Sequence, residues 1–356
     1  MQDLLLLSRD TPIAMIKNSI AEPIIPERLP LYFRYFSDAK AWLESRAVDD
    51  HRTNSRLLKK ALRLGNRDDL TSVLAVNAAT ITDNYWVRPL GDDSLCYSDV
   101  RFKMNLFDQL ALCGSVHSFD QPPSRTPELT NIGSFEKCWR LENDQWWMYK
   151  SGKQEELFSE MLAFRVGKLL GLPMAEYEPA GSYIKSRDFT ENACVDFEPA
   201  AGIIGSAFNY IKIYKALKAI SVEIAEMYVR MCYYDGLILN MDRHEYNFGA
   251  LRDCSTGELL GFAPFFDHNI ALVSRGYPIG EPKDMLITDF AELLRFIGKP
   301  LYVKKLVEDE VLAESQRIPF ELPSTASVSA PKEFTAKYIL RREKALNEHC
   351  AGLIEH

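Results

Sequence analysis

Apolar residues recur every three or four positions through the second half of the chain, and this period predicts helices. The clearest case is 226–239, where Met227, Met231, Tyr234 and Ile238 fall on one side. The same criterion predicts further helices over 154–170, 208–220, 289–297, 301–313 and 331–349. We therefore expect a mostly helical C-terminal half, because each such helix must bury its apolar stripe against a neighbour.

The first half of the chain has a different pattern. Residues 1–30 place four prolines among apolar runs, a density that fits edge strands and turns better than helices. Helices are predicted from Ser37, which can cap the first, and over 54–64, ending at Gly65. A turn leading into a short strand is expected over 82–89. His51 and His117 are interpreted as surface or structural residues.

A hairpin is predicted after the Pro-rich linker 121–127. Residues 138–141 and 146–150 alternate in polarity around a turn, and period two places Trp146, Met148 and Lys150 on one face. The preceding loop contains Gly133 and Ser134, and backbone N–H groups beside a glycine can bind phosphate. In that interpretation Lys150 reaches the phosphates and Met148 covers the adenine. A plain hairpin tip explains this stretch equally well.

The helix over 154–170 would supply a partner for Lys150. Glu160 lies beside its apolar stripe and is the best candidate to pair with the lysine ammonium. Glu155 and Glu156 are rivals, but they lie in the first turn, where acidic residues complement the helix dipole. Short strands are expected over 176–179 and 182–184. The segment 185–187 is predicted to be a hinge before the helical part.

The strongest chemical pattern is an Asp followed five residues later by an Asn, with a second Asp after an apolar run. These residues are Asp242, Asn247 and Asp267. In phosphoryl transfer the first Asp accepts the proton of the attacking hydroxyl, and the other two hold magnesium. The spacing alone arises often by chance. The preceding buried helix and the β segment 259–266, which leads into Asp267, favour the phosphoryl-transfer interpretation.

Composition restricts the setting of this chemistry. The 356-residue chain can form two or three packed units, with 47% hydrophobic and 26% charged residues. Its net charge of −8 argues against a nucleic-acid or anionic-membrane surface as the main partner. Seven dispersed cysteines without metal-like spacing indicate free thiols in a reducing cytoplasm. Neither a signal sequence nor a membrane span is predicted.

The ordered set of motifs resembles the HipA-like serine/threonine kinases, in particular the shorter, stand-alone members. That family has a Ser-x-x-Gly-x-x-x-Lys loop, a strand lysine, a helix glutamate ahead of Gly-Leu, and Asn-x-Asp-Arg-His-x-x-Asn before a strand ending in Asp. The matching positions here are 130–137, Lys150, Glu160 with Gly171 and Leu172, 240–247, and Asp267. The resemblance covers roughly 125–310. Thr130 departs from it, because the family often has an autophosphorylated serine there.

The resemblance implies an α+β, protein-kinase-like two-lobed fold with an N-terminal subdomain at 1–120, an N-lobe at 121–187 and a helical C-lobe at 188–356. It implies a protein serine/threonine kinase that uses ATP and Mg²⁺, with a protein substrate and an antitoxin or other regulator as a further partner. Asp242 would be the base and Asn247 and Asp267 the metal ligands. The implied nucleotide-binding residues are Gly133, Ser134, Lys137, Met148, Lys150, Glu160 and His244, of which His244 is expected to brace the loop.

Autophosphorylation would fall on Thr130 or Ser134, although Thr130 can equally begin a strand. The Asp-Arg-His-x-x-Asn string also occurs in phosphoinositide lipid kinases. A small-molecule or lipid kinase with the same core is therefore an alternative. A further alternative is an inactive kinase-like binding module, against which the intact set of catalytic residues counts.

Overall fold

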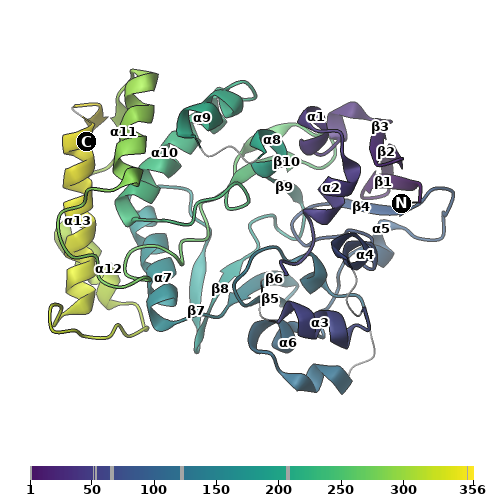
Figure 1. Ribbon diagram of the computed structural model, residues 1–356, viewed down its shortest axis with the longest axis horizontal. Helices are drawn as coiled ribbons and strands as arrows, with labels where there is room; N and C mark the ends of the chain where they lie inside the picture. Colours follow the sequence, from purple (N-terminus) through teal and green to yellow (C-terminus); the bar gives the residue numbers. More distant parts are fainter. Residues whose placement is uncertain are drawn as a thin grey trace. The chain divides into compact units, whose positions relative to one another are not determined.

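The computed structural model describes residues 2–50, 52, 54–64, 68–120, 124–205, 209–350 and 352–356. The chain forms two compact units, and each unit combines several chain segments (Figure 1). Unit 1 consists of Met1–Ser151, Ala180–Ile203 and Ala250–Leu260, and unit 2 of Gly152–Pro179, Ile204–Gly249 and Gly261–His356. The three-part division expected from the sequence stays a prediction.

The N-terminal part of unit 1 is built on a sheet of order β3-β2-β1-β4. Its strands are β1 (Leu4–Ser8), β2 (Thr11–Lys17), β3 (Ile20–Pro23) and β4 (Tyr85–Pro89). The prolines lie where a missing N–H does least harm, since Pro12 is near the start of β2 and Pro23 ends the edge strand β3. The predictions of strands in 1–30 and of a strand ending at Pro89 are confirmed.

Short helices lie between β3 and β4 or follow β4 in the chain. They are η1 (Pro26–Arg28), α1 (Tyr32–Tyr35), α2 (Ala39–Glu44), α3 (Ser55–Ala61), α4 (Asp69–Leu74), α5 (Tyr97–Val100), α6 (Asp108–Cys113), η2 (Val116–Asp120) and η3 (Pro127–Thr130). The predicted cap Ser37 is wrong: the carboxylate of Asp38 accepts the N–H groups of Lys40 and Ala41 at 2.9 and 3.0 Å. Gly65, His51 and the linker residues 121–123 lie outside the described residues. His117 is exposed, as predicted.

A second sheet has the order β5-β6-β8-β7. Its strands are β5 (Lys137–Glu142), β6 (Gln145–Lys150), β7 (Tyr177–Ala180) and β8 (Tyr183–Arg187), so the predicted hairpin and both short strands are confirmed. The hinge expected at 185–187 is wrong. These residues belong to β8, where Ser186 pairs with Met148. A polar stretch can form a strand because strand pairing uses the hydrogen-bonding groups of the backbone.

A third sheet has the order β11-β10-β9. It contains β9 (Val195–Pro199), β10 (Gly249–Asp253) and β11 (Leu259–Phe262). The hairpin formed by β10 and β11 separates Asn247 from Asp267 in the sequence. Its tip belongs to unit 1, whereas the residues on either side of it belong to unit 2.

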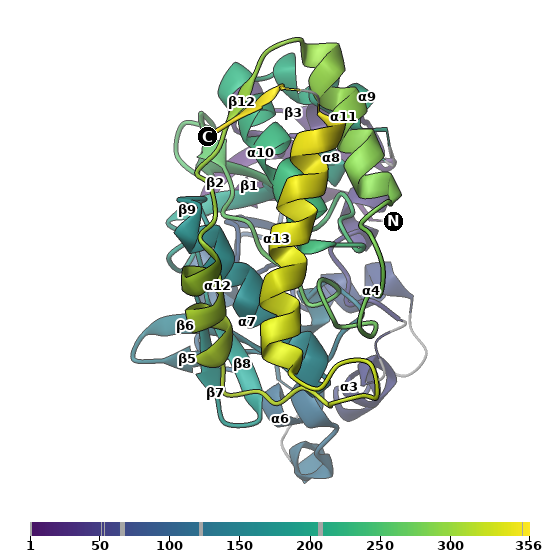
Figure 2. The same ribbon diagram turned by 90° about the vertical axis from the view of Figure 1, so that its left-hand side faces the viewer.

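Unit 2 is mostly helical, as the apolar period predicts. Figure 2 shows α13 alongside α12, and the two helices contact each other. The helices are α7 (Gln154–Leu169), α9 (Tyr210–Lys218), α10 (Val222–Ile238), α11 (Met285–Ile297), α12 (Glu308–Gln316) and α13 (Pro331–His349), and the short α8 (Ala201–Ile204) lies at the boundary of the units. The predictions for α7, α10 and α13 are confirmed.

Two of the helix predictions were wrong at their starts. Helix α11 begins at Met285 rather than at 289, because the Asp284 side chain caps it through the N–H of Ile287. The helix expected over 301–313 begins only at Glu308. Residues Leu301–Tyr302 instead form β12, which pairs in parallel with β13 (Ile354–Glu355) near the end of the chain.

Helix α10 ends at a fixed position because α11 and α13 pack around its last turn. Gly236 leaves room for Leu346 of α13, since a Cβ at this position would lie 3.2 Å from that side chain. The buried Arg342 of α13 donates to the carbonyl oxygen of Gly236 at 2.6 Å and forms an ion pair with Asp284. The segment that follows α10 therefore starts from a rigid support.

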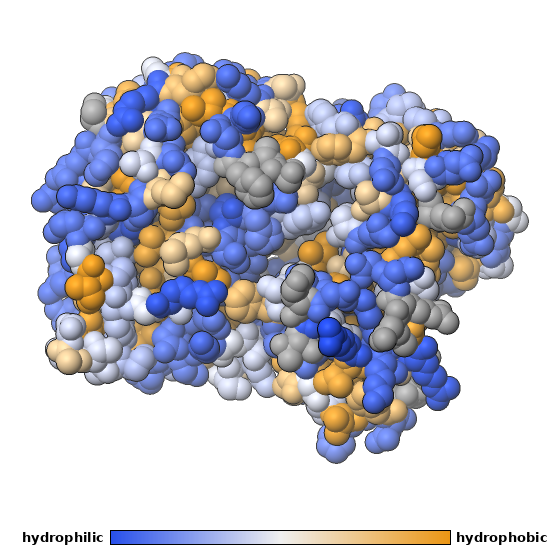
Figure 3. All heavy atoms as spheres, in the orientation of Figure 1, coloured by the Kyte–Doolittle hydropathy of each residue, from blue (hydrophilic) through white to orange (hydrophobic). Residues whose placement is uncertain are grey.

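The described surface carries no sign of a bilayer-spanning element. None of the helices within the described residues is both long and apolar enough to cross a membrane. Figure 3 shows hydrophilic residues over most of the visible face, with apolar side chains scattered among them.

Candidate active site

The loop after α10 begins with a reversal of the backbone. Leu239 adopts a left-handed conformation with φ 52°, which ends the helix. The buried Asn240 then fixes the next turn: its amide nitrogen donates to Asp235 Oδ1 at 2.8 Å, and its amide oxygen accepts the N–H of Asp242 at 3.3 Å. Asn240 thus orients the backbone of the predicted base.

Arg243 holds the whole loop together, a role that the sequence analysis did not assign. Its guanidinium forms a two-point ion pair with Asp235 of α10, at 2.9 and 3.0 Å. The same side chain, 6% exposed, donates to the carbonyl oxygens of Asn247 at 2.5 Å and Phe266 at 2.9 Å. A planar fork of donors suits this task, because one buried cation can satisfy several fixed acceptors. The residue before Asp267 and the predicted ligand Asn247 are thereby tied to one group.

Asp242 and Asn247 lie within one hydrogen-bonded loop. The amide nitrogen of Asn247 donates to the carbonyl oxygen of Asp242 at 3.2 Å, which leaves the amide oxygen as an acceptor. Burial raises the pKa of Asp242, and the charge of Asp267 raises it further, while His244, Arg275 and Arg243 act in the opposite direction. Asp242 and Asp267 are therefore electrostatic neighbours.

His244 contributes less to the loop than predicted. It is partly exposed rather than buried, and its Nδ1 accepts the N–H of Tyr246 at 3.3 Å. Its ring also lies 6.2 Å from the ring of Tyr246. His244 does brace the local turn, but Arg243 is the buried group that connects the loop to its surroundings.

The approach to Asp267 is only partly a strand. The β segment predicted over 259–266 ends at Phe262, and Phe265 then pairs with Met174 in an isolated bridge.

Hard oxygen donors from Asn247 and Asp267 suit magnesium, which completes its shell with phosphate oxygens and water. Among the described residues no group of three or more His, Cys, Asp or Glu side chains could hold a metal without such outside ligands.

Within unit 1 the structure brings three of the predicted nucleotide-binding residues together. Lys137 and Lys150 are direct partners in the β5–β6 ladder, so their side chains leave the same face. Gly133 has φ 112°, and a Cβ there would lie 2.4 Å from the Lys137 ammonium nitrogen. Ser134 is exposed beside them.

The positions of Thr130 and Met148 are settled by packing. Thr130 is 6% exposed, ends η3 rather than beginning a strand, and its hydroxyl donates to the carbonyl oxygen of Ala79 at 2.7 Å. Met148 is partly buried against an apolar cluster that includes Trp139 and Trp146. Its predicted contact with adenine stays a prediction.

Two of the three candidate glutamates of α7 are buried, Glu156 and Glu160. Glu160 is fully buried on α7. Glu156 instead accepts the N–H of Lys153 at 2.9 Å and caps the helix. This agrees with the expectation that acidic residues in the first turn complement the helix dipole. The pairing of Glu160 with Lys150 stays a prediction. Within unit 2 the Glu160 carboxylate accepts the N–H of His268, the residue after Asp267, at 2.9 Å.

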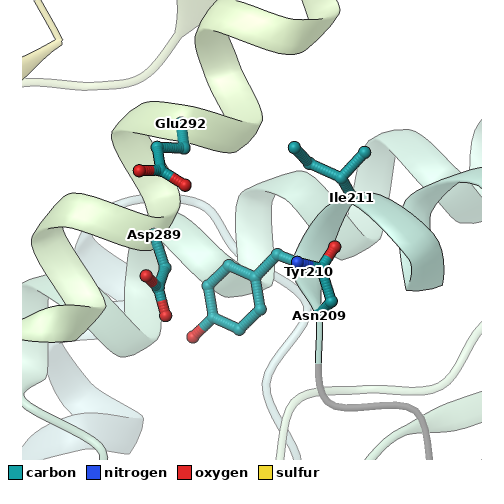
Figure 4. Close-up of a pocket in the computed structure, with 5 residues that line it drawn as sticks. All are labelled: Asn209, Tyr210, Ile211, Asp289 and Glu292. Atoms are coloured by element: carbon teal, nitrogen blue, oxygen red, sulfur yellow. The ribbon is translucent and has the colours of Figure 1, made fainter.

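A separate cavity of about 270 Å³ lies between α9 and α11. Figure 4 shows the carboxylates of Asp289 and Glu292 on α11 facing Tyr210 and Ile211 on α9, with Asn209 at the edge. No predicted site residue lines it. The cavity is slightly smaller than the roughly 300–1,000 Å³ of typical small-molecule sites.

Comparisons with known proteins support the fold. The chain matches no family model, and no curated protein matches it. It resembles a chain in the Shewanella oneidensis MR-1 toxin–antitoxin complex of HipA, HipB and operator DNA, at 11% identity over 97% of each chain with a TM-score of 0.53. The Helicobacter pylori proinflammatory kinase CtkA matches 61% of this chain and 94% of its own at 18% identity, with a TM-score of 0.49. The mixed α and β, HipA-like fold implied by the motifs is therefore confirmed.

Proposed function

We propose that this protein is an ATP- and Mg²⁺-dependent serine/threonine protein kinase of the HipA-like type. The observation that carries the proposal is the single hydrogen-bonded assembly around Arg243. Arg243 donates hydrogen bonds to the carbonyl oxygens of Asn247 and of Phe266, the residue before Asp267. The charge of Asp267 in turn raises the pKa of Asp242. Phosphoryl transfer needs a base and two metal ligands held in this relation.

The residues of the loop have separate tasks in this mechanism. Asp242 accepts a hydrogen bond from the acceptor hydroxyl and takes its proton as the phosphoryl group transfers. Asn247 and Asp267 would hold Mg²⁺, which neutralises phosphate charge when bound. Asn240 and Arg243 fix the backbone, so that the loop is preorganised and does not have to rearrange during the reaction.

The nucleotide side of the mechanism rests on unit 1. Lys137 and Lys150 present two ammonium groups from one face of the β5–β6 hairpin, beside the left-handed Gly133. These groups would contact the ATP phosphates, with Glu160 orienting Lys150 and Met148 covering the adenine. The N–H groups around Gly133 and Ser134 would complete the phosphate site.

The proposed acceptor is a hydroxyl group on a protein in the cytoplasm, in line with seven free cysteines among the described residues. The Shewanella complex contains HipB, so a protein regulator is part of the proposal for this chain. That complex also contains operator DNA, whereas direct nucleic-acid contact by this chain is not expected from its charge.

Radiolabelled ATP with Mg²⁺, supplied to the purified chain with and without cell lysate, tests the proposal. We expect label on protein, and we expect Asp242→Asn and Asp267→Asn to lower the transfer by several orders of magnitude with the fold intact by circular dichroism. Glu245→Gln is the matched control, because it removes a carboxylate from the same loop without touching these tasks. Wild-type transfer by either aspartate variant, or label only on lipid or small molecules, would contradict the proposal.

A further inference from the structure

Asp267 has an unusual backbone for a residue with a side chain. Its φ is 63°, in the left-handed region that side chains rarely adopt. Just before it the chain is extended beside 173–175, where the N–H of Phe265 donates to Pro173 at 2.7 Å and the N–H of Ala175 donates to Phe265 at 3.0 Å. The left-handed residue that follows this extended stretch is therefore the predicted metal ligand itself.

Side chains accept the N–H groups of Asp267 and of the residue after it. The N–H of Asp267 donates to the hydroxyl oxygen of Tyr177 at 3.2 Å, and the N–H of His268 donates to Glu160 at 2.9 Å. Tyr177 is 4% exposed, begins β7, and its ring lies 6.0 Å from that of Phe164 on α7. The acceptor oxygen is thus fixed on a rigid ring that a strand and a helix both position.

We propose that Tyr177 is a positioning residue for magnesium binding by Asp267. The inference rests on the proposed function. A left-handed backbone is held only where its surroundings over-determine it, and the direction of the Asp267 carboxylate depends on that backbone. Tyr177 supplies the hydrogen-bond acceptor for the N–H of Asp267, and Glu160 supplies the acceptor for the N–H of His268. Both contacts lie within unit 2.

The substitution Tyr177→Phe removes this acceptor oxygen and keeps the ring. The Asp267 N–H then lacks the hydroxyl acceptor, and the carboxylate can point in other directions. Loss of an outer partner of a metal ligand commonly weakens metal affinity about 10–100-fold. We expect the Mg²⁺ concentration for half-maximal activity to rise by about that factor. The kcat at saturating Mg²⁺ should fall much less, because Asp242 and Asn247 are untouched.

The experiment measures phosphoryl transfer by the full chain against free Mg²⁺ at fixed ATP. A second measurement follows Mn²⁺ binding by electron paramagnetic resonance in the presence of a non-hydrolysable ATP analogue, and it needs no turnover. Tyr183→Phe is the control, since it removes a hydroxyl from the neighbouring strand β8. We expect a higher Mg²⁺ concentration for half-maximal activity and weaker Mn²⁺ binding for Tyr177→Phe only.

The possible failures are distinguishable. If Asp267→Asn is inactive while Tyr177→Phe has wild-type Mg²⁺ and Mn²⁺ affinity, the positioning role is wrong and the proposed function stands. A fall in kcat without any change in metal affinity would likewise overturn it. If Asp267→Asn itself retains wild-type activity, the metal assignment, and with it the proposed function, is wrong.

Discussion

Two buried arginines, Arg243 and Arg252, lie nine positions apart on the same stretch of chain and stabilise different parts of the molecule. Arg243 in unit 2 joins Asp235 to the carbonyl oxygens of Asn247 and Phe266. Arg252 in unit 1 is fully buried. It forms an ion pair with Glu198 and donates to the carbonyl oxygens of Leu29 at 2.8 Å, Glu27 at 2.7 Å and Gly257 at 2.9 Å.

The difference lies in what each arginine connects. The partners of Arg243 are Asp235 on α10 and two carbonyl oxygens of the proposed catalytic region. The partners of Arg252 lie at the β10–β11 tip, on β9, on β4 and in the N-terminal segment. The comparison indicates that the same residue type, paired with a buried carboxylate in both places, organises the proposed catalytic loop in one and joins distant segments of the fold in the other.

Among the changes that test this comparison, the largest effect is expected from Arg243→Lys. An ammonium can still pair with Asp235, but it cannot reach the carbonyl oxygens of Asn247 and Phe266 at the same time. A displacement of about 1 Å costs on the order of 10²-fold in rate, so turnover should fall by roughly that factor. Turnover per folded molecule, with folding checked by circular dichroism, measures this. Wild-type turnover would show that Arg243 does not organise the loop.

The matched change, Arg252→Lys, should act on stability. It removes charged hydrogen bonds to carbonyl oxygens, each worth about 1.5–3 kcal/mol, so the free energy of unfolding should fall by at least about one such bond. Urea denaturation of both lysine variants gives the comparison. We expect activity per folded molecule to stay within about twofold of wild type, since no partner of Arg252 touches the loop. If Arg252→Lys lost much of its turnover without losing stability, the proposed difference between the two arginines would be wrong.

Asp196 on β9, in the same buried region of unit 1 as Arg252, should make stability depend on pH. Burial raises its pKa from 3.8 to about 7, helped by the charges of Asp83 and Glu198, although Asn84 donates to it. The folded protein therefore binds a proton here that the unfolded chain has already lost above about pH 4. Stability from this group should fall as pH rises from about 4 to 7. Denaturation of Asp196→Asn across this range should show a smaller slope than wild type, and an unchanged slope would contradict the assignment.

The smallest effect is expected at Thr130. Thr130→Val keeps the shape but removes the hydrogen bond to Ala79, so the free energy of unfolding should fall by about 1 kcal/mol. Because the hydroxyl is buried and engaged, we expect phosphate on the exposed Ser134 rather than on Thr130 after incubation with Mg-ATP. Mass spectrometry of the two positions measures this. Phosphate on Thr130 in the folded protein would show that η3 opens.

The sequence predicted the elements whose pattern is local. Helices α7, α10 and α13 follow from their apolar period, and the β5–β6 hairpin from its alternation. Asp242, Asn247 and Asp267 were proposed from spacing, because a loop motif keeps its order whatever surrounds it, and their roles stay predictions. The burial of Glu160 followed from its position beside an apolar stripe.

The missed features depend on contacts between distant segments. Tyr177 lies 90 residues from Asp267, so no spacing rule connects them. Arg243 stood inside the recognised motif, yet its role required the carbonyl oxygens of Asn247 and Phe266 to converge. The hinge expected at 185–187 failed because the backbone of these residues pairs with β6, and Ser186 is buried there. The helix expected over 301–313 failed because its first two residues form β12, which pairs with β13 near the C-terminus.

The tip of the β10–β11 hairpin has a practical consequence for protein engineering. Surface turns are the usual places for inserting an epitope tag or a fluorescent domain. Gly257 has φ +76°, and a Cβ there would lie 2.0 Å from the carbonyl oxygen of Glu27, so this turn has no room for added chain. The turn at Gly181 between β7 and β8 has nothing within 4 Å of such a Cβ. A reporter placed at Gly181 should leave the protein folded, whereas one placed at Gly257 would separate the hairpin from its support.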